Sequence, residues 1–114
     1  MRILNNVITK KELLLIAKNS FGDLVKAVVD VDREIVAIDA ELHSDLEALC
    51  LENGSLQNSL WGINYYPEME GEDFIEFDSM INLRPSIGNI SRGIKDEKIR
   101  KKIVKISYKR IKKT

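Results

Sequence analysis

The chain contains 114 residues, of which 44% are hydrophobic and 32% are charged, with 18 basic residues against 18 acidic ones. These values predict a single globular domain over residues 1–114, and they exclude a membrane-spanning protein because no run approaches about 20 apolar residues. The start of the chain lacks the apolar region of a secretory signal, and the single cysteine, Cys50, suits a reducing compartment, so we expect a cytoplasmic protein with a buried, inert thiol.

Hydrophobic periodicity and turn residues predict seven main elements in the order αββαββα, with a further short strand near the N-terminus. The predicted helices cover about 10–20, from Ser44 to Asn53, and about 96–112, and the predicted strands cover 2–8, 24–31, 34–40, 60–66 and 73–84. The second and third of these strands are so close in sequence that they predict an antiparallel hairpin, because a parallel pair needs a long crossover. We therefore expect an α+β fold in which three helices pack on one face of an antiparallel sheet of about four strands.

Capping signals mark where the helices begin. Thr9 and Glu12 have the spacing of a capping box, in which the hydroxyl accepts a backbone amide and the glutamate reaches back to the cap residue. Ser44 and Glu47 repeat this pattern, and Asp96 is expected to cap the last helix.

A first candidate site lies at the start of the second helix. Glu41, His43 and Asp45 would share a side if the chain is extended there, and with Asp78 they could hold a metal ion that activates water. His43 could also act as a general base, since histidine titrates near neutrality. This pattern predicts a metal-assisted hydrolase, either a phosphoesterase or a nuclease. The alternative is that His43 makes only a capping or surface hydrogen bond.

The second candidate site is the predicted strand 73–84 and the loop 85–93 that follows it. Strand alternation would place three polar residues on one face, namely Asp78, Asn82 and Arg84. The loop would add four more hydrogen-bonding side chains, Ser86, Asn89, Ser91 and Arg92. Together they predict a binding module for a phosphorylated or other anionic small ligand, because guanidinium and amide groups donate to phosphate and carboxylate. The alternative is that Arg84 and Arg92 pair with acidic residues such as Asp78 and Glu76 and so hold the loop in place.

Charge is strongly separated along the chain. Residues 30–78 contain 14 Asp/Glu and one basic residue, whereas residues 95–113 contain ten Lys/Arg. The basic segment could fold against the acidic middle and neutralise it, or it could bind nucleic acid or an acidic protein partner. No helix-turn-helix, zinc-finger or RNA-recognition pattern supports a particular nucleic-acid module. The sheet edges leave a homodimer open.

Four segments together resemble a known family: FGDLVKAVVD (21–30), ELHSDLE (41–47), WGIN (61–64) and FDSMINLRPSIGNISRG (77–93). They are similar to a small prokaryotic family of uncharacterised proteins, recorded as a domain of unknown function. The resemblance extends over nearly the whole chain and implies neither an activity nor a cofactor.

Overall fold

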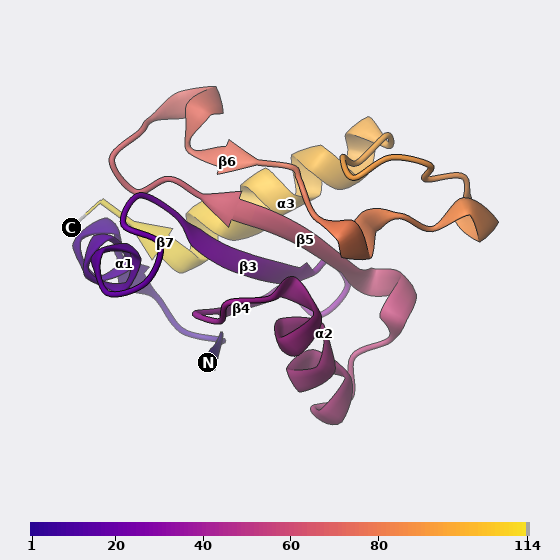
Figure 1. The fold of residues 1–114 in the computed structure, drawn as a ribbon, viewed down its shortest axis with the longest axis horizontal. Helices are drawn as coiled ribbons and strands as arrows, with labels where there is room; N and C mark the ends of the chain where they lie inside the picture. The colour runs from indigo at the N-terminus through magenta and orange to yellow at the C-terminus, as the bar shows by residue number, and fades with distance from the viewer. Residues whose placement is uncertain (114) are drawn as a thin grey trace.

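The computed structural model describes residues 1–113, which form an α+β fold with three helices and a five-stranded antiparallel sheet in the order β1-β4-β3-β5-β6 (Figure 1). The elements are β1 (Arg2–Leu4), β2 (Ile8–Thr9), α1 (Lys10–Lys18), β3 (Val25–Asp30), β4 (Ile35–Ile38), α2 (His43–Glu52), β5 (Leu60–Tyr65), β6 (Ile75–Glu76), α3 (Glu97–Arg110) and β7 (Ile111–Lys112). The predicted hairpin is confirmed, with β3 and β4 antiparallel. The sequence predicted one strand over 2–8, whereas β1 joins the sheet and β2 pairs with β7.

The helices cover both faces of the sheet. Val29 of β3 belongs to a large apolar core that includes Leu13 of α1 and Ile103 of α3, whereas Val28 packs in a smaller core with Leu46 of α2. Figure 1 shows α2 and α3 on opposite sides of the sheet. The expectation that all three helices lie on one face is therefore wrong. The central strands are apolar at consecutive positions, so both of their faces must be covered.

Two of the three predicted helix caps are confirmed. The Thr9 hydroxyl accepts the Glu12 amide at 3.1 Å, and the Asp96 carboxylate accepts the Lys98 amide at 2.8 Å. The Ser44 capping box is wrong, because α2 begins at His43 and its cap residue, Leu42, has no side-chain acceptor. The first amides of α2 are consequently left without a side-chain cap.

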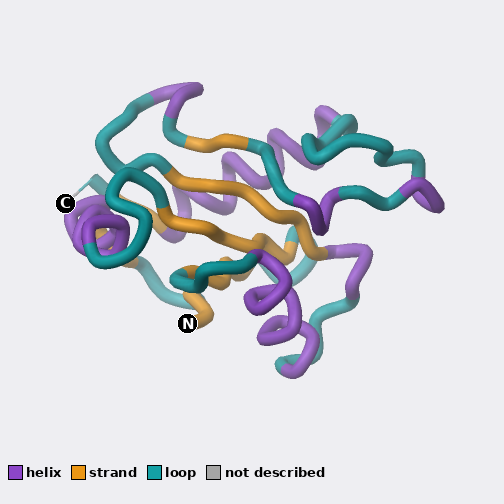
Figure 2. The backbone as a smooth tube through the Cα atoms, in the orientation of Figure 1, coloured by secondary structure: helices purple, strands orange, loops and turns teal. Residues whose placement is uncertain are grey.

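The predicted strand 73–84 is the main error of the sequence interpretation. Within this range only residues 75–76, which form β6, pair with β5. The chain then leaves the sheet as a long irregular segment with short 3-10 turns at 80–82 and 85–87 (Figure 2). A side chain continues the pairing in place of backbone: the Asn82 carboxamide accepts the Gly62 amide at 2.8 Å and donates to the Gly62 carbonyl at 2.9 Å. The irregular segment also passes so close to β5 that residue 62 must be glycine, since a Cβ there would lie 2.5 Å from the Ser79 side chain.

Candidate functional site

A row of three polar side chains crosses the sheet on the side that faces α2. In the strand register Lys26 of β3 lies opposite Asn64 of β5, and Asn64 lies opposite Glu76 of β6. Directly opposed residues on neighbouring strands place their side chains on the same face of a sheet. The row therefore provides a polar floor beside the start of α2.

This floor belongs to a hollow of about 470 Å³, which we call the His43 hollow. Its polar lining consists of Lys26, His43, Ser44, Asn64, Tyr66, Glu76, Asp78, Ser79 and Arg92. Leu24, Leu42, Met80 and Ile81 add apolar surface. The volume falls within the usual range for small-molecule sites.

His43 is the first residue of α2 and is 9% exposed. Its Nε2 lies 2.8 Å from the Ile63 carbonyl oxygen, which can only accept, so this nitrogen carries the proton and donates it. Burial lowers the pKa of His43 below its ordinary value, and the Ile63 hydrogen bond and the neighbouring Asn64 carboxamide oppose this shift only in part. The ring is therefore uncharged at neutral pH. Its Nδ1 lone pair makes no hydrogen bond within residues 1–113.

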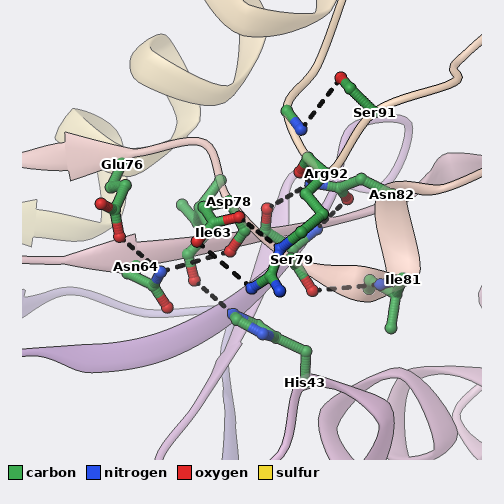
Figure 3. A network of polar contacts seen from close by, with 12 residues as sticks. His43, Ile63, Asn64, Glu76, Asp78, Ser79, Ile81, Asn82, Ser91 and Arg92 are labelled. Carbon is green, nitrogen blue, oxygen red and sulfur yellow. Dashed lines mark hydrogen bonds and ion pairs between the residues drawn. The ribbon is translucent and has the colours of Figure 1, made fainter.

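Asn64 contributes an acceptor that has no partner. Its amide nitrogen donates to Glu76 Oε1 at 2.8 Å and to the Asp78 carbonyl at 3.3 Å, and these contacts fix the orientation of the carboxamide. The Oδ1 atom is buried and accepts no hydrogen bond in the described chain, although the residue is only 6% exposed. In Figure 3 this oxygen points away from Glu76, toward the side on which His43 lies. An unmet acceptor of this kind costs about 1–3 kcal/mol. Because the oxygen is closed to solvent and the Asn64 side chain lies beside the His43 ring, a donor from outside the protein would reach it only if one of these side chains moved.

The charges around the hollow are unevenly matched. The Arg92 guanidinium donates two hydrogen bonds to the Asp78 carboxylate, at 2.7 and 3.3 Å. The Glu76 carboxylate accepts one hydrogen bond from the Asn64 amide and one from the Tyr66 hydroxyl. Lys26 has no ion pair within residues 1–113, and its ammonium lies 5.1 Å from the Phe21 ring centroid. The uncapped start of α2 adds the positive end of a helix dipole beside it. The Lys26 side of the hollow therefore favours an anionic group.

Of the residues predicted from the sequence, His43, Asp78 and Arg92 do meet in this hollow, but Asn82, Arg84 and Asn89 do not. The prediction that Asp78, Asn82 and Arg84 share one accessible strand face is wrong, because the strand ends at Glu76 and a 3-10 turn breaks the alternation. Asn82 is fully buried against Gly62.

Arg84 and Asn89 hold the irregular segment in place. The Arg84 guanidinium donates to the Leu60 carbonyl at 2.6 Å, pairs with Glu47 at 3.3 Å and lies 5.0 Å from the Trp61 ring centroid. The Asn89 amide donates to carbonyls within the segment, two of them at 2.7 and 2.8 Å. Both arginines do pair with carboxylates, as the alternative interpretation expected, and Asp78 is the partner of Arg92. The partner of Arg84 is Glu47, whereas Glu76 accepts from Asn64 and Tyr66 instead.

The remaining candidates lie apart from the hollow. Ser86 and Ser91 are exposed and do not line it. Glu41 and Asp45 are also exposed, and no three His, Cys, Asp or Glu side chains converge on a possible metal position anywhere in residues 1–113. The arrangement of Glu41, His43, Asp45 and Asp78 that a metal-assisted hydrolase would need is therefore not formed.

Sequence reasoning missed the contribution of Lys26, Asn64 and Glu76. The available signal was a polar residue within an otherwise apolar strand, as Lys26 is in Val25–Asp30 and Asn64 is in Leu60–Tyr65. A charged or amide side chain inside a buried strand needs a partner or a solvent-filled space, which the hollow supplies.

A family model described as "Protein of unknown function (DUF5674)" matches residues 2–110. No curated protein and no solved structure matches the chain. None of the helices described is long and apolar enough to cross a membrane.

Proposed function

This chain belongs to the DUF5674 family of proteins of unknown function, and from that premise we propose that the His43 hollow binds a small polar molecule that carries an anionic group. One observation carries the proposal. The Asn64 Oδ1 atom is buried without a partner in a hollow large enough for such a ligand. A ligand that displaces the His43 or Asn64 side chain slightly and places a donor at this oxygen would remove the cost of the unmet acceptor.

The anionic group would lie at the Lys26 side of the hollow. There the unpaired ammonium and the first amides of α2 both attract negative charge, since Leu42, His43 and Ser44 line the same space. The two carboxylates of the hollow lie at its other side, with Asp78 engaged by Arg92 and Glu76 by Asn64 and Tyr66. An anion is therefore directed toward Lys26 and away from β6.

The rest of the ligand would carry a hydroxyl or an N–H group. This group would donate to Asn64 Oδ1, and the His43 Nδ1 lone pair offers a second acceptor. The apolar edge formed by Leu24, Leu42 and Met80 would cover a small carbon skeleton. Hydroxylated phosphates and hydroxylated or amino carboxylates meet these requirements, whereas a bare inorganic anion meets only one of them.

Titration followed by NMR tests this proposal at the level of single residues. Ribose 5-phosphate, nucleoside monophosphates and hydroxy acids would be added, with inorganic phosphate for comparison. We expect the organic anions to shift the Asn64 side-chain amide and the His43 ring signals at lower concentration than phosphate does. His43 is the only histidine of the chain, so its ring signals are unambiguous.

Matched variants localise the effect. Lys26→Met should weaken binding of the anions, whereas Lys11→Met, which removes an exposed lysine of α1, should leave it unchanged. Asn64→Leu should remove the preference for hydroxylated anions over inorganic phosphate. The proposal fails if no compound shifts the two residues, or if both lysine variants lose binding equally.

A further inference from the structure

The solvent side of α3 carries a stripe of lysines. Lys98, Lys101, Lys102, Lys105 and Lys109 follow one another at steps of one to four residues and are all exposed, whereas Ile103, Ile106 and Ser107 are buried on the opposite side. At 3.6 residues per turn these lysines share one face over a length of about 16 Å. We call this face the lysine stripe.

The acidic middle of the chain neutralises only one edge of the stripe. Lys109 lies 3.1 Å from Glu34, and Lys102 lies 4.0 Å from Asp32, both in the turn between β3 and β4. These pairs are exposed and therefore weak. Lys98, Lys101 and Lys105 form no ion pair with any described residue.

Acidic groups also lie along the other flank, where Glu72 and Glu97 share a shallow hollow with Arg100 and Lys101. The centre of the stripe is therefore a line of positive charge bordered by acids. The hypothesis that the basic segment folds back onto the acidic middle therefore explains the ion pairs at the edge of the lysine stripe, but it does not explain the lysines at the centre of the stripe.

An aromatic hollow continues the stripe at its C-terminal end. The hollow, which we call the Tyr108 hollow, has a volume of about 350 Å³ and combines Phe74 and Tyr108 with three lysines and one carboxylate. The lysines are Lys10, Lys112 and Lys113, and the carboxylate, Glu70, pairs with Lys113 at 3.7 Å. The Tyr108 side chain is 45% exposed, and its ring centroid lies 6.0 Å from that of Phe74. Tyr108 lies three residues after Lys105, so the exposed ring stands beside the line of lysines.

We propose that the lysine stripe and the Tyr108 hollow together bind single-stranded nucleic acid. Lysines would contact successive phosphates, and an unstacked base would pack on the Tyr108 ring, as in proteins that bind single strands without sequence preference. A duplex or an acidic protein would use the lysines but would have no unstacked base to place against the Tyr108 ring in a hollow lined by three lysines and Glu70. The surface lies on the opposite side of the sheet from α2 (Figure 1), and the inference does not depend on the ligand of the His43 hollow.

Fluorescence anisotropy with labelled 12-nucleotide oligo(dT) and oligo(U), across a series of salt concentrations, tests the proposal. Lys101→Gln/Lys105→Gln should reduce affinity at low salt by about tenfold or more, and should lower the slope of log K against log salt by about 1.4. The control Lys11→Gln/Lys18→Gln removes the same charge from α1 and should have little effect. Tyr108→Leu should weaken binding about fivefold or more through lost stacking.

Other outcomes overturn the proposal. Absence of binding to both oligonucleotides at low salt does so, as does an equal loss in the two double variants. Polyphosphate bound as tightly as oligo(dT), with no effect of Tyr108→Leu, would assign the surface to polyanions in general. Salt-sensitive self-association in sedimentation, without nucleic-acid binding, would assign it to a second copy. Circular dichroism of each variant checks that it is folded.

Discussion

Replacement of Asn82 by alanine should destabilise the protein by about 3–5 kcal/mol, a large share of the about 5–15 kcal/mol that holds a typical domain together. The Asn82 carboxamide satisfies two buried backbone groups, the Gly62 amide at 2.8 Å and the Gly62 carbonyl at 2.9 Å. It also donates at 2.9 Å to the partly buried Arg92 carbonyl, which accepts the Ser79 amide as well. Each unsatisfied group costs about 1–3 kcal/mol, and water entering the cavity recovers part of that cost. The same change should release the segment that carries Asp78 and Arg92 to the His43 hollow.

Urea unfolding followed by fluorescence measures this effect, because Trp61 is the only tryptophan and is buried on the strand next to Gly62. With a slope of about 1–3 kcal/mol per molar for small proteins, the midpoint should fall by about 1–5 M. Ser86→Ala, at an exposed position of the same segment, should change stability by less than about 0.5 kcal/mol. If the two variants unfold at the same urea concentration, the reasoning that a side chain replaces strand pairing at Gly62 is refuted.

Three further predictions concern other parts of the chain. Gly62→Ala should destabilise the protein by about 1–3 kcal/mol, because the new Cβ would lie 2.5 Å from the Ser79 side chain. Adding Ser79→Gly should recover part of this loss in urea unfolding. If the double variant instead loses the sum of the two single losses, the clash is contradicted. NMR titration of the His43 ring should give a pKa below 6.5, because burial disfavours the charged ring. The unfolded chain then takes up this proton more readily than the folded protein does, so the free energy of unfolding is highest above about pH 6.5 and decreases as the pH falls through the folded-state pKa. The variant His43→Gln should remove this pH dependence. Burial raises the pKa of the Cys50 thiol to about 11, so a thiol reagent at pH 8 should react quickly only in urea, and rapid reaction of the native protein would show that the thiol is accessible.

Much of the fold followed from local sequence signals. The Thr9 and Asp96 caps, the antiparallel pair of β-branched runs and the Asn53-Gly54 stop each depend on residues within a few positions of one another. Such signals depend on neighbouring residues only, so the tertiary contacts that form around them do not change the elements they favour. The α+β class and the three helices could therefore be read from the chain.

The segment after β6 could not be read in this way. Its alternating apolar and polar residues matched a strand, but the pairing at Gly62 is completed by the Asn82 side chain. A backbone strand and a carboxamide offer the same donor and acceptor to the neighbouring strand. Nothing in the local pattern distinguishes the two.

The amino-acid sequence alone determined the family, the helices, the central hairpin and three members of the candidate site, His43, Asp78 and Arg92. Only the tertiary structure decided that these residues meet a polar row formed by Lys26, Asn64 and Glu76, and that Asn82 and Arg84 turn inward. The physical reason is that strand register is a long-range property. It brings together side chains that lie far apart in the sequence, and those contacts determine which polar groups of the described residues find a partner and which do not.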